Sequence, residues 1–547
     1  MTELQPLTLP LTGRQVIEAS AGTGKTWTLA ALYLRLVLGH GRQGPQGQTH
    51  DGLMPPQILV MTFTEAATAE LRERIRQRLH DAAVLFDSSA QQRVLPEGFE
   101  ADSFLTELRD SFDKTLWPRC ALQLSAAADW MDDAAIYTIH AWSRRMLSQH
   151  ALDSRHLFEQ TRLDNAQALQ RQLVQDYWRT WFYPQAAEVL QPMQPSIGRS
   201  PDDLLSELQL VWREQDRTPR VPQDPAFTPS QAIAAHMQWL TQCQATAQAA
   251  RVAWTPEVLH ALQAKRLKGA SEKNYAKWLE GLQAWAEQSA SLKPDTLARF
   301  TLSALQDKGW PEPERFAFFA ALDAHVALVA EAPDTGARIT QHAAHTVGLA
   351  YQAAKTQRAA FDFSDLLQNL YRAVMAEDGR LAAAIRTQYP VALVDEFQDT
   401  DPWQYGSLHR IYDSEIVTAD NALVMIGDPK QAIYSFRGAD LSTYLQARGQ
   451  ALAHNPDALH TLSGNRRSSA SLVRAINHVF TQIDAPFSPE HASGNAGGSD
   501  IAFVEVTPEG DVAALPLGNG RLQPGLTVWQ MQGDEPVVKA GDHLHHM

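Results

Sequence analysis

A glycine-rich segment near the amino terminus has the residue types of a loop that binds phosphate groups. An apolar run at Arg14–Glu18 precedes it and helical spacing follows from Trp27 to Leu38, so it should join a strand to a helix. Backbone N–H groups at a helix start can bind phosphate, Lys25 can reach the β and γ oxygens, and Thr26 can bind Mg²⁺. We expect the nucleotide to bind Ala19, Ser20, Ala21, Gly22, Thr23, Gly24, Lys25 and Thr26.

Two adjacent carboxylates, Asp395 and Glu396, follow the apolar run Val391–Val394. In such a pair, one carboxylate can bind Mg²⁺ directly or through water, and the next can orient and deprotonate an attacking water. We therefore expect Asp395 to bind the metal and Glu396 to act as the general base. An acidic strand end taken alone is more typical of a solvated turn or a helix cap, and the phosphate loop is what favours the catalytic interpretation.

A third chemically unusual segment, Ile426–Ala439, follows another apolar run. Gln431 is a neutral group that can sense a γ-phosphate. Tyr434 and Phe436, next to Arg437, can present aromatic rings to nucleic-acid bases. Stacking contributes about 1–3 kcal/mol per base and is insensitive to base identity, which suits a motor that moves along any DNA. Taken alone, the aromatic pair is more typical of a protein core.

These segments require a sheet that brings several strand ends together. The strand-like runs alternate with helical patterns, which predicts an α/β fold with a parallel sheet. From about residue 151 to 345 the sequence is rich in Ala, Gln, Leu and Trp, and we interpret it as a helical insertion. Its tryptophans should anchor helices to one another, because large aromatic side chains dominate buried area. The predicted strands include 14–18, 58–62, 391–394 and 422–426.

Composition narrows the class of protein further. A chain of 547 residues is long enough for several domains. Its net charge of −15 argues against nucleic-acid binding through a broad basic surface, so DNA contacts must be local. Two cysteines, Cys120 and Cys243, are too few for a disulfide framework. With no signal-peptide pattern and no apolar run long enough to span a bilayer, we expect a cytoplasmic chain without a membrane partner.

In this order the three segments resemble the helicase motifs of the UvrD/Rep-like superfamily 1 motors, and they are most similar to the RecB family of exodeoxyribonuclease V (RecBCD) subunits. Thr62–Leu71 looks like motif Ia, Tyr137–Trp142 like the Thr-x-His motif, and Phe361–Leu367 like the stretch before the acidic motif. The resemblance implies contacts with single-stranded DNA from Phe63, Thr64, Thr138 and His140. In isolation, His140 is more typical of a structural histidine.

Gly464–Ser468 resembles motif IV of the same family. Arg467 then matches the arginine that reaches the γ-phosphate from the second motor lobe. In the family an aromatic residue precedes it and stacks on the nucleotide base, whereas Arg466 stands here. Stacking on adenine would therefore use a guanidinium plane.

The resemblance implies ATP and Mg²⁺ as cofactors and a P-loop fold with RecA-like lobes. We expect residues 1–150 to begin the first lobe, 151–345 to form the helical insertion, 346–460 to resume the first lobe, and 461–547 to begin a second. The implied function is ATP-driven translocation on single-stranded DNA from duplex ends, in double-strand break repair and homologous recombination. RecC-like and RecD-like subunits are the implied partners.

Motifs V and VI and the family's nuclease domain have no counterpart in this sequence. Because an arginine finger contributes about 10³–10⁵-fold in rate, we expect the chain to bind ATP·Mg²⁺ but to hydrolyse it poorly. Two alternatives stay open from the sequence. One is a stand-alone UvrD-like or AddA-type helicase, and the other is a non-catalytic fragment that binds DNA or a partner.

Overall fold

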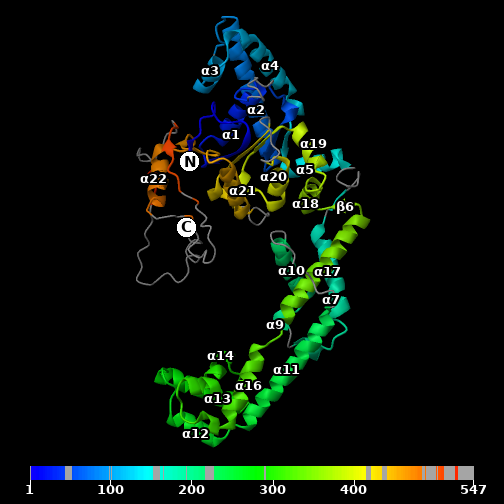
Figure 1. Cartoon of the computed structure of the whole chain (residues 1–547), viewed down its shortest axis with the longest axis vertical. Helices are drawn as coiled ribbons and strands as arrows, with labels where there is room; N and C mark the ends of the chain where they lie inside the picture. Colours follow the sequence, from blue (N-terminus) through cyan, green and yellow to red (C-terminus); the bar gives the residue numbers. More distant parts are fainter. Residues whose placement is uncertain are drawn as a thin grey trace, which may run out of the picture. The chain divides into compact units, whose positions relative to one another are not determined.

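The computed structural model of the chain divides into two compact units (Figure 1). One, which we call the sheet unit, comprises Met1–Gln160 and Phe361–Met547, and the other, the helical unit, comprises Thr161–Ala360. The structure describes residues 2–42, 52–97, 99, 101–151, 161–163, 165–191, 194–215, 227–288, 291–413, 421–433, 440–482, 487, 501, 503–510 and 524–527.

The sheet unit is built on a seven-stranded sheet in which every described strand pair is parallel, so the predicted α/β fold is confirmed. The strands at Ile58–Thr62, Val391–Val394 and Ala422–Gly427 are almost entirely apolar, as expected where both faces of a sheet are covered. In spatial order the strands are β1 (Thr2–Glu3), β9 (Leu459–Leu462), β2 (Gly13–Ala19), β8 (Ala422–Gly427), β7 (Val391–Val394), β3 (Ile58–Thr62) and β4 (Ile136–Thr138).

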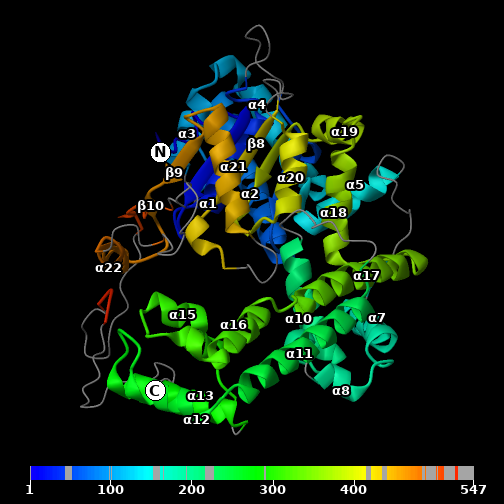
Figure 2. The same cartoon turned by 60° about the horizontal axis from the view of Figure 1, so that its bottom comes forward.

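Helices pack on both faces of this sheet (Figure 2). Successive residues of β8 show the two cores: Val424 belongs to one and Met425 to the other. The first core contains residues of α1 (Lys25–Val37), α2 (Glu65–Ala90), α3 (Ser103–Asp110) and α4 (Trp117–Asp129). The second contains residues of α5 (Ile139–Gln149), α18 (Phe363–Val374), α19 (Arg380–Gln388), α20 (Pro402–Ile411) and α21 (Leu441–His454).

The strand register aligns the carboxyl ends of the strands along one edge of the sheet. Glu18 pairs with Gly427, Val394 pairs with both Met425 and Met61, and Thr62 pairs with Thr138. Ligands of open parallel sheets bind outside this edge. After β9 come β10 (Gly464–Asn465), α22 (Ala470–Phe480) and β11 (Thr507–Pro508), where β10 and β11 form a separate parallel pair.

The helical unit contains two apolar cores joined by long helices. One core lies along α7 (Ala166–Trp181), α10 (Pro201–Gln215), α17 (Thr335–Gln357) and the start of α11 (Pro229–Val252). The other joins the end of α11 to α12 (Pro256–Ala264), α13 (Glu272–Ala286), α14 (Pro294–Leu297), α15 (Leu302–Asp307) and α16 (Ala317–Ala330). The chain enters and leaves the unit side by side, because the Thr161 N–H donates to the Ala359 carbonyl (2.9 Å).

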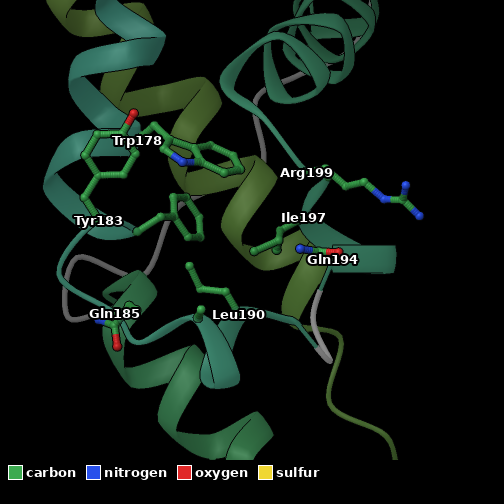
Figure 3. A pocket seen from close by; sticks show the side chains of 10 residues that line it. Trp178, Tyr183, Gln185, Leu190, Gln194, Ile197 and Arg199 are labelled. Carbon is green, nitrogen blue, oxygen red and sulfur yellow. The ribbon is translucent and has the colours of Figure 1, made fainter.

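Tryptophans anchor both helical cores, as predicted. Trp178, Trp285 and Trp310 are at most 7% exposed, and others pack partly buried against the same clusters. Where α7 meets α8 (Ala187–Leu190) and α9 (Gln194–Ile197), Trp178 and Leu190 line an open cavity of about 280 Å³ (Figure 3). None of the helices in the described ranges combines the length and apolar composition that crossing a membrane requires.

Three histidines of the helical unit place a ring nitrogen beside a hydroxyl group within these cores. His236 Nδ1 lies 3.2 Å from Thr335 Oγ1, His325 Nδ1 lies 3.0 Å from Thr246 Oγ1, and His342 Nδ1 lies 2.9 Å from Tyr177 Oη. Burial lowers the pKa of all three. Positive charge also lowers it, from Arg251 at His325 and from His345 at His342.

Acidification should therefore loosen the helical unit. Because the folded histidines have a pKa below the ordinary 6.5, unfolding takes up protons, so stability is complete above about pH 6.5 and falls below it. Each histidine contributes up to about 1.4 kcal/mol per pH unit. Hydrogen exchange of α11 and α16, corrected for intrinsic rates, should lose protection between pH 7.5 and 5.5.

His325→Gln should weaken this pH dependence, whereas His260→Gln, at an exposed position on α12, should not. Equal protection at both pH values in the unmodified chain would contradict the prediction.

Candidate active site

The phosphate-loop sequence occupies the turn between β2 and α1. β2 ends at Ala19 and α1 begins at Lys25, so the predicted strand, loop and helix are all present. Gly22 (φ 80°) and Gly24 (φ 93°) adopt the left-handed region that favours glycine, and Gly24 is the helix N-cap. Thr23 Oγ1 donates to the Ser20 carbonyl (2.8 Å), which closes the turn. Lys25 and Thr26 form the first residues of the helix, where backbone N–H groups lack helical acceptors.

The acidic pair lies directly opposite this loop. Lys25 Nζ donates to Glu396 Oε2 at 2.7 Å, although the two residues are 371 positions apart. The contact is partly shielded, with 12% of the Lys25 side chain and 34% of the Glu396 side chain exposed. Asp395 continues the sheet, because its N–H donates to the Met61 carbonyl (2.9 Å). Glu396 adopts a left-handed φ of 48°, and its N–H donates to Asp395 Oδ1 (3.0 Å).

The carboxylates at this edge are crowded. Burial, and then the charge of Glu396, raise the pKa of Asp395 to about 6, and Lys25 opposes the shift. Burial and Glu396 likewise raise the pKa of Asp399 to about 6. A carboxyl group in such a position gains from a nearby cation. The site thus holds more negative charge than Lys25 alone neutralises.

Gln398 links the acidic pair to the next strand, a contact that sequence reasoning missed. Its Nε2 donates to Glu396 Oε2 (2.9 Å), and its Oε1 accepts the N–H of Asp428 (2.9 Å). Asp428 in turn accepts from Gln431 Nε2 (2.7 Å) and pairs with Lys430 Nζ (2.8 Å). Gln431 therefore lies at the end of a hydrogen-bonded chain that begins at the predicted general base. The one available signal was the place of Gln398, two residues after Glu396.

The motif IV segment packs against the phosphate loop. The Arg466 N–H donates to the Gly22 carbonyl (2.9 Å), and Asn465 Nδ2 donates to the Ala21 carbonyl (2.9 Å). A Cβ on Gly22 would lie 2.8 Å from the Cβ of Arg467. The structure therefore brings Arg466 and Arg467 to the loop.

Arg466 also meets an aromatic ring that the sequence analysis left unassigned. Its guanidinium carbon lies 5.9 Å from the centroid of the Trp27 ring, and Glu509 Oε2 accepts from its Nη2 (3.1 Å). Trp27 follows Thr26 directly in α1. An aromatic ring and a guanidinium plane thus lie together beside the loop. Trp27 and Arg466 are far apart in the chain, so the sequence does not predict that they lie together.

Four of the residues expected to contact DNA, Phe63, Thr64, Thr138 and His140, lie at or just after the ends of β3 and β4. Thr64 and Thr138 cap α2 and α5, since their hydroxyls accept the N–H groups of Ala67 (3.1 Å) and Ala141 (3.4 Å). β3 and β4 are neighbours, so these two caps are adjacent. Phe63 is partly buried, and burial lowers the pKa of His140. Tyr434, Phe436 and Arg437 lie outside the described residues.

The chemistry of the site fits a magnesium-bound nucleoside triphosphate. The turn of the loop is open at Gly24, where an added Cβ would meet no atom within 4 Å. Lys25 has a carboxylate in place of a phosphate partner, and a divalent cation beside Asp395 would stabilise the charged carboxylate that burial and Glu396 disfavour. Lys25, the phosphate loop and the acidic pair therefore meet at one edge of the sheet.

Comparison with known proteins identifies the family. Residues 2–451 match the model of the UvrD/REP helicase N-terminal domain. The RecBCD enzyme subunit RecB of Escherichia coli (strain K12) is 36% identical over 552 positions, covering 100% of this chain and 43% of the relative. The RecBCD enzyme subunit RecB of Haemophilus influenzae is 32% identical, covering 97% of this chain and 44% of the relative.

The resemblance to RecB is thereby confirmed, and the chain spans less than half the length of these relatives. The parallel sheet and the family together imply a P-loop, RecA-like fold. Since the family model covers most of its length, the chain belongs to the UvrD/REP helicase family.

Proposed function

We propose that this chain is the ATP-driven motor portion of a RecBCD-type helicase-nuclease, which translocates on DNA during double-strand break repair and homologous recombination. The observation that carries the proposal is the 2.7 Å contact between Lys25 and Glu396 at the edge where the phosphate loop ends. It brings a phosphate-binding cation and a base together, which phosphoryl transfer to water requires.

Each part of the site has a role in this proposal. The backbone from Ala19 to Thr26 and the Lys25 amine bind the phosphates of ATP, while Thr26 and Asp395 hold Mg²⁺. When bound, Mg²⁺ neutralises the charge of the phosphate oxygens. Glu396 orients the attacking water and takes its proton. Gln431 and Arg467 sense the terminal phosphate. Arg466 stacks on the adenine base of ATP, with the Trp27 ring beside it.

The ion pair also predicts how the site responds to nucleotide. Lys25 donates to Glu396 in the structure, so phosphate binding must draw the amine away from that carboxylate. Glu396 then keeps its hydrogen bond from Gln398 and becomes free to bind water. The base is therefore restrained until a nucleotide occupies the loop.

We propose that single-stranded DNA runs along the edge formed by Phe63, Thr64, Thr138 and His140. Tyr434, Phe436 and Arg437 complete the stacking contacts. A small number of stacking contacts is the mode of DNA binding that we expect of a chain whose net charge is −15, because that charge argues against binding through a broad basic surface. Closure of a cleft between two RecA-like lobes, the second beginning at 461–547, would couple hydrolysis to stepping. The predicted division of the first lobe into 1–150 and 346–460 around a 151–345 insertion belongs to this proposal.

Partners follow from the names of the relatives, which are subunits of the RecBCD enzyme. We propose RecC-like and RecD-like subunits, duplex DNA ends as the entry point, and a cytoplasmic location. A stand-alone motor would instead act without such subunits. Copurification of tagged chain from its own host separates these arrangements.

Replacement of Lys25 tests the nucleotide site. Lys25→Ala removes the cation that pairs with phosphate, so affinity for Mg²⁺·ATP should fall at least about tenfold, the loss of about 1.4 kcal/mol. Affinity for a dT oligonucleotide should stay within about twofold of the unmodified chain. Fluorescence titrations with a labelled nucleotide and a labelled oligonucleotide measure both.

Lys273→Ala, at an exposed position on α13, is the matched control and should leave both affinities unchanged. Equal nucleotide affinity in Lys25→Ala and the control would overturn the assignment of the loop. A non-catalytic binding module is indicated instead if the unmodified chain binds nucleotide without any turnover in the presence of DNA.

Replacement of Glu396 separates binding from catalysis. Glu396→Gln removes the base, so whatever rate of phosphate release the unmodified chain shows should fall by about 10²–10⁴-fold. Nucleotide affinity should be equal or higher, because an uncharged amide competes less well than a carboxylate for Lys25. Phosphate release at saturating ATP with a dT oligonucleotide, and nucleotide titration, are the two measurements. Glu280→Gln on α13, an exposed site, serves as control. Retained turnover in Glu396→Gln would contradict its role as base.

A further inference from the structure

Glu18 is a partly buried carboxylate placed just before the phosphate loop. It is the penultimate residue of β2, in register with Gly427 of β8 and Thr461 of β9. Only 12% of its side chain is exposed. Any displacement of the loop must act on the strand end that carries this side chain.

Both partners of Glu18 come from one helix, α21. Tyr444 Oη and Arg448 Nη1 each donate to Glu18 Oε1 at 3.1 Å. Arg448 is 17% exposed in its side chain, and Tyr444 is 1% exposed. Burial, and then the charge of Glu18, raise the pKa of Tyr444 well above its ordinary value, so the phenol keeps the proton that it donates.

The same helix contacts the acidic segment. The ring of Tyr444 packs against Phe397, the residue after Glu396, with centroids 5.9 Å apart. At the start of α21, the Asp440 N–H donates to the Thr400 carbonyl (3.3 Å). α21 is therefore joined to both halves of the nucleotide site, through Glu18 on one side and through the segment 397–400 on the other.

The chain that leads into α21 carries the residues proposed to stack on DNA. Tyr434, Phe436 and Arg437 precede Asp440 by three to six positions in the sequence. A shift of a packed helix is passed to the chain attached to its end, because packed elements move as rigid bodies. α21 thus follows the DNA-stacking residues in the chain and is bonded to the phosphate-loop strand.

We propose that Glu18, Tyr444 and Arg448 are positioning residues that couple the phosphate loop to α21, so that nucleotide occupancy changes the affinity for single-stranded DNA. This inference rests on the proposed function and goes beyond it, since none of the three residues touches nucleotide or DNA in that proposal. The charge-assisted hydrogen bond from Arg448 to Glu18 has a defined geometry, so it holds α21 in one position relative to β2, whereas an apolar contact would let the helix slide.

The ion pair between Glu18 and Arg448 is tested with two single variants and with a double variant that removes both charges together. Glu18→Met removes an acidic partner of Arg448, and Arg448→Met removes the charged donor to Glu18, so each single variant should lower the thermal midpoint. The double variant Glu18→Met/Arg448→Met removes both charges and should recover most of that loss. Arg14→Met, at the opposite end of β2, is the matched control, because Arg14 is 4% exposed and donates to the Tyr412 carbonyl (3.1 Å).

For each full-length chain, the Kd for a labelled dT oligonucleotide is measured without nucleotide and with a non-hydrolysable Mg²⁺·ATP analogue. The coupling factor is the larger of these two Kd values divided by the smaller. We expect a factor of about 5 to 150 in the unmodified chain. Both single variants and the double variant should bring it to within about twofold of one, whereas Arg14→Met should keep it.

Recovery of the coupling factor together with thermal stability in the double variant would show a merely structural contact and overturn the inference. So would an unmodified chain that binds both ligands independently. An unmodified chain that binds no nucleotide would instead overturn the proposed function itself. Normal nucleotide binding and coupling in the unmodified chain, with normal coupling in the three variants, would refute this link alone.

Discussion

The site depends on one constraint: parallel strands must end in register at a common edge. Lys25 and Glu396 meet at 2.7 Å because β2 and β7 flank the same central strand, β8. A slip of one residue in β7 would turn Asp395 and Glu396 each to the face of the sheet opposite the one that it now occupies. In the observed register the strands bury apolar residues on both faces of the sheet.

Charge crowding follows from this arrangement and gives the edge its chemistry. Three carboxylates, Asp395, Glu396 and Asp399, lie near a single lysine, and two of them have a pKa raised to about 6. Neutral amides fill the gaps: Gln398 bridges Glu396 to the backbone of Asp428. A network of this kind transmits changes, because a new partner for one member alters the hydrogen bonds available to the next.

Local patterns in the sequence were enough to predict the parallel sheet, the turn at Gly22 and Gly24, and the strand that precedes Asp395. These features depend on periodicity and on a few residues with special backbone or ionic properties. The contacts of Gln398, Trp27 and Glu18 were not predicted, because each depends on where a distant segment returns. Composition alone does not mark where single elements end: α17 runs to Gln357 and β9 runs to Leu462.

The first and last residues of the helical unit lie next to each other, which bears on whether the unit can be removed or replaced. Thr161 and Ala359 are held together by one hydrogen bond, so their backbones are separated by about the 4.8 Å spacing of neighbouring strands. A tight turn of a few residues could close that distance. Because its two ends are this close, the 161–360 segment is suited to deletion, or to exchange for another segment with equally close ends.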